Sequence, residues 1–416
     1  MRNIISFKVA PENFEVEHMD AIPQAVLDYS KMHLVERRFI NGLIRLLKPR
    51  RVLELGVAEG AGSVVILNAI SDMSDTTLTS FDTRFKLWYT PEKNVGFAFD
   101  MMYPGGNKQW TLHKGADFSQ YADTFSEPFD MVIIDTVHLH PVESLNFLTV
   151  LPYLSEQAAV VFHDLALYTL QDETLNAFPN VCLANKLAYD TIVGEKLKPS
   201  EENYLEDCHG FASIGVVQVS PDTKKYIRNI FDMLYFPWPS YDYLASPFMN
   251  SVAKIIKKNY APELFEQFCA ATMVNAMFIA NDYKYVECDG EVAWPHERLR
   301  QANKTVFYGA GYNCGRLLWL FERNGLDRPV EIWDIAARDK QPVENIPVVL
   351  PPFPDISAKY ADTIIVITIG DADVSRDVKN EILSRGPGSE VYEWKEVVKS
   401  VLYAKVSELA AIEEDD

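Results

Sequence analysis

One turn between an apolar strand and an apolar helix constrains the fold of this chain more than any other stretch. The run from Val52 to Ser63 reads VLELGVAEGAGS, and apolar residues continue as a helix over 64–70. A strand, a glycine-rich turn and a helix in this order are typical of the first unit of a doubly wound α/β sheet. The glycines at 56, 60 and 62 do not follow the spacing G-x-G-x-x-G of dinucleotide-binding turns.

The turn also carries two acids, Glu54 and Glu59, which decide the charge of the ligand that it can accept. Carboxylates repel a pyrophosphate and attract an ammonium or sulfonium ion. S-adenosylmethionine is the common ligand of that kind, so the turn predicts a pocket for this nucleoside. A glycine turn can also be only a tight connection, so the strands that follow must decide. The predicted cofactor contacts of the turn are Glu54, Gly56, Glu59, Gly60, Gly62 and Ser63.

Composition narrows the class of protein. A length of 416 residues predicts two or three domains, and 48% apolar residues can fill their cores. The net charge of −20 would repel a phosphate backbone, which argues against a nucleic-acid partner. The sequence has no apolar run of about 18 residues for a membrane span and no signal-peptide core. Five scattered cysteines without a C-x-x-C pair favour a cytoplasmic protein without structural zinc.

Apolar runs alternate with helical patterns through the first half of the chain, which predicts a mostly parallel sheet in a domain over 1–220. Residues 20–47 are expected to form a helix before the first strand. The segment 83–109 contains Pro104-Gly105-Gly106 and is expected to be partly a mobile loop. The predicted strands are 52–55, 77–82, 110–115, 129–135, 158–164 and 214–219.

Beyond residue 220 the pattern changes twice. A helical segment and linker are expected over 221–300, with apolar faces that serve either the core or a homodimer surface, and with a polar linker at 286–303. A second, smaller Rossmann-like α/β domain is expected over 301–405, because a strand–glycine–helix unit begins again at Thr305. The acidic tail over 406–416 is expected to be solvated.

Two strands of the first domain end in acids suited to a nucleoside, because ligands of parallel sheets bind at the carboxyl ends of the strands. Asp82 ends the second strand and can accept both hydroxyls of a ribose; the alternative is an aspartate that caps a turn or helix. Ala116 and Asp117 follow the third strand, where Asp117 could accept a hydrogen bond from an adenine amine. A plain turn is the alternative there.

Four polar residues close the fourth and fifth strands: Asp135, His138, His163 and Asp164. Adjacent strand ends lie about 5 Å apart, so these side chains can converge. Two carboxylates and imidazoles suit Mg²⁺ or another divalent metal, and histidine also suits general-base catalysis. The alternative for His138 is that it only opens the helix beginning at Pro141.

Several stretches of the first domain are similar to one branch of the class I S-adenosylmethionine-dependent methyltransferases. They are residues 36–44, Lys48-Pro49, the glycine turn, Ile134-Asp135-Thr136-Val137-His138, His163-Asp164 and residues 185–194. The branch contains macrocin-type O-methyltransferases and cephalosporin-hydroxylase-like proteins. The resemblance implies methyl transfer to a hydroxyl of a sugar, a glycoside or another small polar metabolite, including polysaccharides and natural products.

The same resemblance frames the roles of the strand-end residues. His138 or His163 is expected to act as the base, Asp135 is expected to serve both catalysis and cofactor binding, and a metal would use Asp135, Asp164 and His163. Two departures bear on the metal. Val137 stands where the branch has a second aspartate, and His163 stands where relatives with a firm magnesium site have an acid. Imidazole is a poorer Mg²⁺ ligand than a carboxylate.

The second glycine turn has a different spacing and charge. Its glycines are Gly309, Gly311 and Gly315, it carries no acid, and Asp334 ends the following strand. The helix start could accept a phosphate and Asp334 a ribose, as in the nucleotide-binding-like domains of nucleotide-sugar enzymes that it resembles. The alternative is a domain without a ligand. Two other functions therefore stay open: an enzyme that uses NAD or a nucleotide-sugar in this domain, and a non-catalytic binding protein.

Overall fold

The computed structural model forms two compact units: residues 1–239 with 254–268, and residues 240–253 with 269–416. The domain boundaries expected from the sequence stay a prediction, and the acidic tail over 406–416 lies outside the described residues. The structure describes residues 21–87, 89–167, 179–199, 213–238, 244, 246–280, 295–352, 363–386, 390–398 and 400–401.

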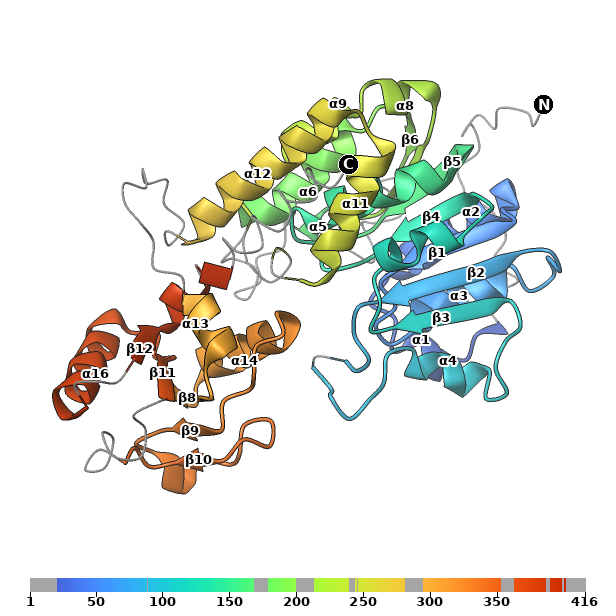
Figure 1. The fold of residues 1–416 in the computed structure, drawn as a ribbon. Coiled ribbons are helices and arrows are strands. Elements are labelled where there is room, and N and C mark those ends of the chain that lie inside the picture. Colours follow the sequence, from blue (N-terminus) through green and yellow to red (C-terminus); the bar gives the residue numbers. More distant parts are fainter. Residues whose placement is uncertain are drawn as a thin grey trace. The chain divides into compact units, whose positions relative to one another are not determined.

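The first unit is built on a seven-stranded sheet (Figure 1). The strands β1 to β5 run parallel to one another, and β7 pairs antiparallel with both β5 and β6. The predicted α/β class with a mostly parallel sheet is therefore confirmed. In sheet order the strands are β3 (Trp110–Lys114), β2 (Thr77–Asp82), β1 (Arg51–Leu55), β4 (Phe129–Ile134), β5 (Leu154–Phe162), β7 (Gly215–Gln218) and β6 (Glu195–Leu197).

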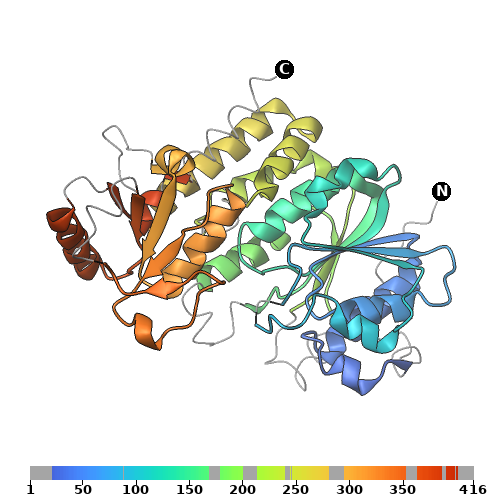
Figure 2. The same ribbon diagram turned by 60° about the horizontal axis from the view of Figure 1, so that its bottom comes forward.

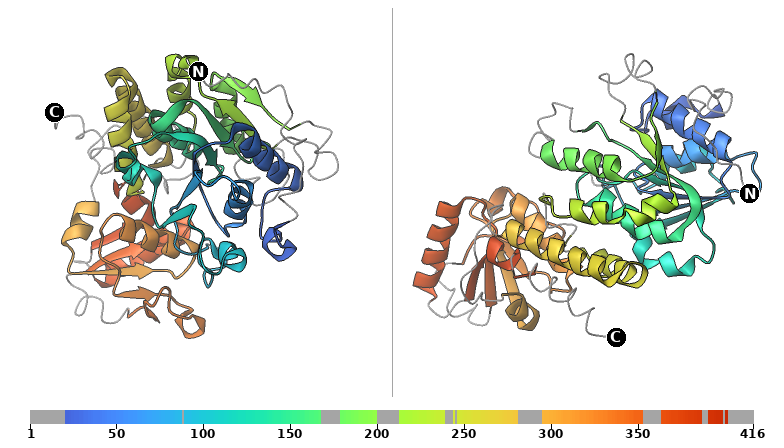
Figure 3. Two further views of the ribbon diagram at one scale, coloured as in Figure 1. Left: turned by 90° about the vertical axis from the view of Figure 1, so that its right-hand side faces the viewer. Right: turned by 90° about the horizontal axis from the view of Figure 1, so that it is seen from above.

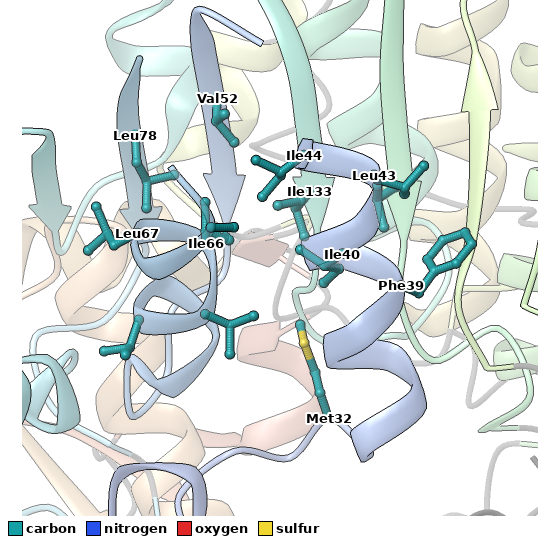
Figure 4. Close-up of a cluster of buried hydrophobic side chains, with 14 of the residues drawn as sticks. Met32, Phe39, Ile40, Leu43, Ile44, Val52, Ile66, Leu67, Leu78 and Ile133 are labelled. Atoms are coloured by element: carbon teal, nitrogen blue, oxygen red, sulfur yellow. The ribbon is translucent and has the colours of Figure 1, made fainter. Parts of the chain in front are cut away.

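Helices cover both faces of this sheet. On one face α2 (Leu34–Leu47) and α3 (Ala61–Ala69) pack over the central strands, and Figure 4 shows their side chains meeting those of Val52, Leu78 and Ile133. The other face is covered by α5 (Val142–Val150) and α6 (Pro179–Thr191), whose aromatic rings contact Phe162. Burial of each large apolar side chain contributes about 2 kcal/mol, so this packing fixes the strands below the site.

The helix expected over 20–47 is two elements, so that prediction was wrong in detail. The structure has α1 (Gln24–Leu27), a turn, and then α2. The hydroxyl of Ser30 accepts from the Met32 N–H at 3.3 Å, and the carboxylate of Glu36 accepts from the His33 N–H at 2.8 Å. These local bonds stop the first helix and start the second, as side-chain caps do.

Three other expectations need correction or detail. Strand β5 begins at Leu154 rather than at 158, because it continues back through exposed residues beside β4. The polar linker expected at 286–303 contains the helix α13 (Pro295–Gln301), in which Leu299 is buried. The loop expected at 83–109 contains α4 (Phe97–Met102), which buries Ala98 and Phe99. The helices expected after residue 220 are α8 (Pro221–Lys225), α9 (Arg228–Met233), α11 (Phe248–Asn259) and α12 (Pro262–Ala280).

The second unit contains a parallel five-stranded sheet, as the predicted Rossmann-like domain requires. Ile382 of α16 (Ala372–Arg385) joins the core on one face, and Phe321 of α14 (Tyr312–Arg323) packs against Phe307 on the other. Figures 2 and 3 show these two helices on opposite sides of the strands. In sheet order the strands are β10 (Val348–Val349), β9 (Glu331–Trp333), β8 (Lys304–Tyr308), β11 (Thr363–Ile367) and β12 (Glu390–Glu393).

In each sheet the strand order reverses beside the first strand of the unit. In the first unit β1 lies between β2 and β4, and in the second β8 lies between β9 and β11. The connections leaving such a pair run to opposite faces, which opens a crevice at the carboxyl ends of the strands. Both glycine turns follow the central strand, so both lie at these crevices.

Candidate functional site

Two close backbone approaches hold the first glycine turn, one against the end of β4 and one against the residue before α4. Gly56 has φ +88°, and a Cβ there would lie 1.8 Å from the carbonyl oxygen of Asp135. Gly60 has φ +91°, and a Cβ there would lie 2.8 Å from the Cα of Gly96. A side chain is excluded at both positions by space and by conformation. Gly62 differs, because a Cβ there would make only ordinary contacts, 3.6 Å from Glu54.

Asp82 binds the backbone of the turn. Its Oδ2 accepts from the N–H groups of Val57 at 3.1 Å and Ala58 at 3.0 Å, and its Oδ1 accepts from the Arg84 N–H at 2.9 Å. The carboxylate therefore fixes the turn at the crevice, whatever ligand it meets. Each carboxylate oxygen can accept more than one hydrogen bond, so a ribose hydroxyl can share this group.

Glu54 and Ser63 lie beneath the turn rather than on its surface. Both are buried, and Glu54 Oε2 accepts from the hydroxyls of Ser63 at 2.7 Å and Ser80 at 2.5 Å. Burial raises the pKa of Glu54 to about 7, although the two serine hydroxyls oppose the shift. This buried acid thus links β1, β2 and α3 under the glycine turn.

Glu59 already has cationic and hydroxyl partners. It is 5% exposed, its carboxylate accepts from the Tyr89 hydroxyl, and Lys31 Nζ lies 3.6 Å from Oε1. The Lys31 side chain is itself exposed, so its pairing with Glu59 is weak. Tyr89 and Lys31 thus extend the polar surface of the turn by two residues that sequence reasoning missed.

The residues after β3 form a capped turn beside Asp82. The N–H of Ala116 donates to the carbonyl oxygen of Asp82 at 3.1 Å. Asp117 is 9% exposed and accepts from the Ser119 N–H at 2.8 Å at the start of a short 3₁₀ helix. Burial raises the pKa of Asp117 despite that bond. Its geometry is that of the turn that the sequence left as the alternative to an adenine contact.

The ends of β4 and β5 bring together the predicted cluster of two histidines and two aspartates. His163 Nδ1 lies 3.1 Å from Asp135 Oδ1 and 3.6 Å from Asp164 Oδ2. His138 Nε2 lies 3.1 Å from Asp164 Oδ2 and 3.4 Å from Asp135 Oδ1. Since Asp135 is also the residue that Gly56 packs against, the cluster adjoins the glycine turn.

Two buried glutamates brace this cluster, and sequence reasoning gave them no role in the site. Glu36 of α2 is fully buried, and its Oε2 lies 3.1 Å from His163 Nε2. Glu143 of α5 accepts from the His138 N–H at 2.6 Å and the Thr136 hydroxyl at 2.9 Å. A signal for Glu36 was present, because it shares the helical spacing of Phe39 and Leu43 on an apolar face.

Backbone conformation also marks the cluster. His138 has φ +59° and Asp164 has φ +55°, in the left-handed region that costs a residue with a side chain about 1 kcal/mol or more. The bonds from Glu143 hold the turn before His138 in this conformation. Strained backbone that is held by buried hydrogen bonds is a feature of functional sites.

The charges of the cluster favour its ionised forms. Burial works against a charged His163, but the carboxylates of Asp135, Asp164 and Glu36 outweigh it and raise the pKa of His163. Burial likewise works against a charged Asp135, yet His163 and His138 lower the pKa of its carboxyl. The carboxylates around His163 therefore favour its protonated form.

The donor set fits a divalent metal. Ligand atoms of Asp135, His138 and His163 all lie within 4.8 Å of one another, and Asp164 adjoins them. Glu36 faces the outer nitrogen of His163, as a carboxylate does behind a metal-bound imidazole. Two imidazoles with carboxylates suit a transition-metal ion better than Mg²⁺. The geometry adds His138 to the predicted ligands Asp135, Asp164 and His163.

The second glycine turn lies in the second unit, beside Asp334. Gly309 and Gly311 line a cavity with Asp334, whereas Gly315 lies within α14 and is not part of its lining. Asp334 Oδ2 accepts from the Ala310 N–H at 2.9 Å. Three of the four residues predicted for this site therefore come together.

Comparison with known protein families bears on the first unit. Residues 53–165 match the model of a family described as a methyltransferase domain. This stretch contains the glycine turn, Asp82, Asp135 and His163. We call the first unit the methyltransferase domain after this match. The doubly wound sheet of this unit and the family match agree with the resemblance to class I methyltransferases seen in the sequence, while the narrower branch stays a prediction.

Solved structures similar to the methyltransferase domain match about half of this chain. They include the O-methyltransferase TomG from Streptomyces achromogenes, involved in tomaymycin synthesis (19% identity, 50% of this chain, 91% of that chain, TM-score 0.36). Another is the methyltransferase PaMTH1 from Podospora anserina (13% identity, 49% of this chain, 87% of that chain, TM-score 0.35). A third is an O-methyltransferase from Bacillus cereus (12% identity, 49% of this chain, 89% of that chain, TM-score 0.34). Likeness at this level assigns no substrate. A comparison with curated proteins gives no match.

Within the part of the chain that the structure describes, no helix is both long enough and apolar enough to cross a membrane.

Proposed function

We propose that this protein transfers a methyl group from S-adenosylmethionine to a hydroxyl oxygen of a sugar, a glycoside or another small polar metabolite. The observation that carries the proposal is the cluster of two histidines and two aspartates beside the glycine turn of a methyltransferase domain. An alcohol is a poor nucleophile, so its methylation needs a group that takes the hydroxyl proton or lowers its pKa. The cluster offers both. The class of acceptor rests on the sequence resemblance.

The methyl donor would lie over the turn at Gly56 and Gly60. Asp82 fixes the turn and would share its carboxylate with the ribose, while Glu59 gives the turn the negative charge that suits a sulfonium nucleoside. Asp135 follows β4 next to Gly56, so it would face both donor and acceptor. Positioning the two substrates in line would supply much of the rate.

His138 is the better candidate for the base of the two histidines. Its side chain is 17% exposed, whereas that of His163 is 3% exposed and has a carboxylate within 3.1 Å of each ring nitrogen. A proton from a bound hydroxyl can reach His138 and cannot easily reach His163. We therefore assign proton transfer to His138 and orientation of Asp135 to His163.

A divalent metal, when bound, would lower the pKa of the acceptor hydroxyl as a Lewis acid. Asp135, Asp164, His163 and His138 would hold it, and Glu36 would orient His163. When His138 binds the metal, its ring nitrogen cannot also accept the hydroxyl proton. Proton removal by His138 and a metal held by all four residues are therefore two alternative mechanisms. Activity after chelation and dialysis distinguishes them.

The test is turnover of S-adenosylmethionine with a panel of sugar and glycoside hydroxyls, with product identified by mass spectrometry. Asp82→Ala should weaken cofactor binding measured by calorimetry. Asp135→Ala should abolish methyl transfer while the circular dichroism spectrum stays unchanged. Asp130→Ala is the matched control, because Asp130 lies near the start of β4, away from the crevice, where its carboxylate accepts from the N–H groups of Arg50 and Arg51. Full activity of Asp135→Ala, or unchanged cofactor affinity of Asp82→Ala, would contradict the assignment.

A further inference from the structure

The crevice of the second unit is a cavity of about 370 Å³. It lies at the carboxyl ends of β8, β9 and β11, and its lining includes Gly311, Asp334, Lys340 and Thr368. The volume falls in the range of small-molecule sites and exceeds what a simple inorganic anion needs. The methyltransferase domain does not use this cavity, so its occupant is a separate question.

The backbone around this cavity repeats the arrangement at the methyl-donor turn. Asp334 Oδ2 accepts from the Ala310 N–H at 2.9 Å and its Oδ1 accepts from the Ala336 N–H at 2.8 Å. Asp82 likewise binds Ala58 N–H in the turn at 3.0 Å and Arg84 N–H at 2.9 Å. Both units therefore use an aspartate at the end of the second strand to fix a glycine turn.

The charged residues around the two turns differ. The first turn carries acids at 54 and 59, while the second turn, residues 309–315, carries none. Lys340 Nζ lies 2.8 Å from Asp334 Oδ2, so the acid of the second crevice is paired with a cation that lines the same cavity. The backbone N–H groups at the start of α14 add partial positive charge. The pair of Lys340 and Asp334 is neutral overall, so the partial positive charge at the start of α14 decides that this crevice can accept an anion.

Gly311 shows that the second turn leaves room for a ligand. Its backbone is extended, with φ −98° and ψ −164°, a conformation open to any residue, and a Cβ there would meet no atom within 4 Å. Folding of the unit does not require glycine at 311. Gly309 differs, since it has φ +109° and a Cβ there would lie 2.9 Å from Thr368 Oγ1. The missing side chain at 311 opens the start of α14 to the cavity.

We propose that this cavity binds a nucleoside diphosphate. Its phosphates lie over Gly311, against the N–H groups at the start of α14 and within reach of Lys340. Its sugar hydroxyls face Asp334, whose Oδ1 keeps capacity for a further hydrogen bond beyond the one from Ala336. The proposal needs no methyl transfer and stands apart from the function of the first unit.

The experiment is isothermal calorimetry of the full chain with ADP and UDP. Saturating S-adenosylhomocysteine is present, so that the first crevice is occupied. Inorganic phosphate and adenosine are titrated alone as separate arms. We expect a diphosphate to bind at least tenfold more tightly than either fragment, and its affinity to fall as salt rises. No binding of ADP or UDP, or binding of adenosine with equal affinity, would overturn the proposal.

Two variants assign the binding to this cavity. Lys340→Met removes the cation, and Gly311→Glu places a carboxylate over the start of α14; each should weaken ADP or UDP binding about tenfold or more. Lys379→Met is the charge-matched control, because Lys379 pairs with Glu396 away from the cavity lining. If Gly311→Glu lowers the melting temperature, Lys340→Met decides alone. Unchanged affinity in Lys340→Met would refute the site.

Discussion

Glu54 makes a prediction that tests the interior of the methyltransferase domain directly. Its carboxyl is 3% exposed, accepts from Ser63 and Ser80, and has its pKa raised by burial from 4.5 to about 7. The perturbation is Glu54→Gln, which removes the titrating group. The amide oxygen of glutamine can accept from the same two serine hydroxyls, so the packing and these hydrogen bonds are retained.

Proton linkage gives the direction in which the free energy of unfolding changes with pH. Because the pKa is raised in the folded protein, the unfolded chain releases the proton from about pH 4.5 upward while the folded protein keeps it until about pH 7. The native protein therefore loses stability as pH rises through this window, by about 3 kcal/mol at 1.36 kcal/mol per pKa unit. Glutamine does not titrate, so the stability of Glu54→Gln relative to the native protein rises by that amount and is constant above pH 7.

The assay is urea denaturation followed by circular dichroism, between pH 5.5 and pH 8. The isoelectric point is about 4.9, so lower pH values would precipitate the protein. Between pH 5.5 and pH 7 the stability of Glu54→Gln relative to the native protein should rise by about 2 kcal/mol. Glu156→Gln, at an exposed position of β5, makes the same charge change and should show no such trend. A difference for Glu54→Gln that is constant or falls with rising pH would refute the reasoning.

Three further predictions concern the glycine turn, the residue behind His163 and the core under α2. Gly56→Ala should prevent folding, because its Cβ would meet the Asp135 carbonyl at 1.8 Å, whereas Gly62→Ala should fold with a melting temperature near that of the native protein. Glu36→Gln, by replacing the charge behind His163, should weaken divalent-metal binding about 10- to 100-fold in calorimetry with zinc; equal affinity would show that Glu36 does not position His163. Leu43→Ala, in the core between α2 and the sheet, should cost about 2–5 kcal/mol in urea denaturation, and a cost under about 1 kcal/mol would contradict that packing (Figure 4).

The sequence predicted the strands that are buried on both faces. Strand β4 is an apolar run followed by the acid Asp135, and parallel strands covered by helices on both sides need such runs. Strands β10 and β12 were not predicted, because they contain two and four residues and carry little apolar pattern. Such short edge strands form only because a neighbouring strand offers its backbone groups.

The strand-end cluster was predictable for a topological reason, and its bracing was not. Asp135 and His163 follow strands that were recognised, and the strand order brings those ends together. Glu36 reaches the same point from a helix 127 positions before His163 in the chain. No local sequence pattern indicates a contact between residues so far apart in the chain. Only the burial of an acid on the apolar face of α2 indicates that it has a partner inside the protein.

The roles of the acids in the first turn depend on strand alternation. Side chains two apart on a strand share a face, so Glu54 lies on the face of Val52, which packs under α2 and α3. That places Glu54 against Ser63 of α3 instead of in the open crevice. Because burial raises the pKa of Glu54 to about 7, its carboxyl supports the turn and adds no full charge to the crevice below that pH.

The two glycine turns of this chain have similar backbone geometry, so their ligand preference must come from their charged residues. Asp82 and Asp334 hold their turns by the same backbone bonds, so the bonds alone do not select a ligand. What differs is Glu59 in the first turn and a lysine beside the second. At about 4 Å, a unit charge near a protein surface changes a ligand's energy by up to about 4 kcal/mol, enough to reverse a preference between cation and anion. Exchanging those charges, and not the glycines, is therefore the change that should exchange the ligands.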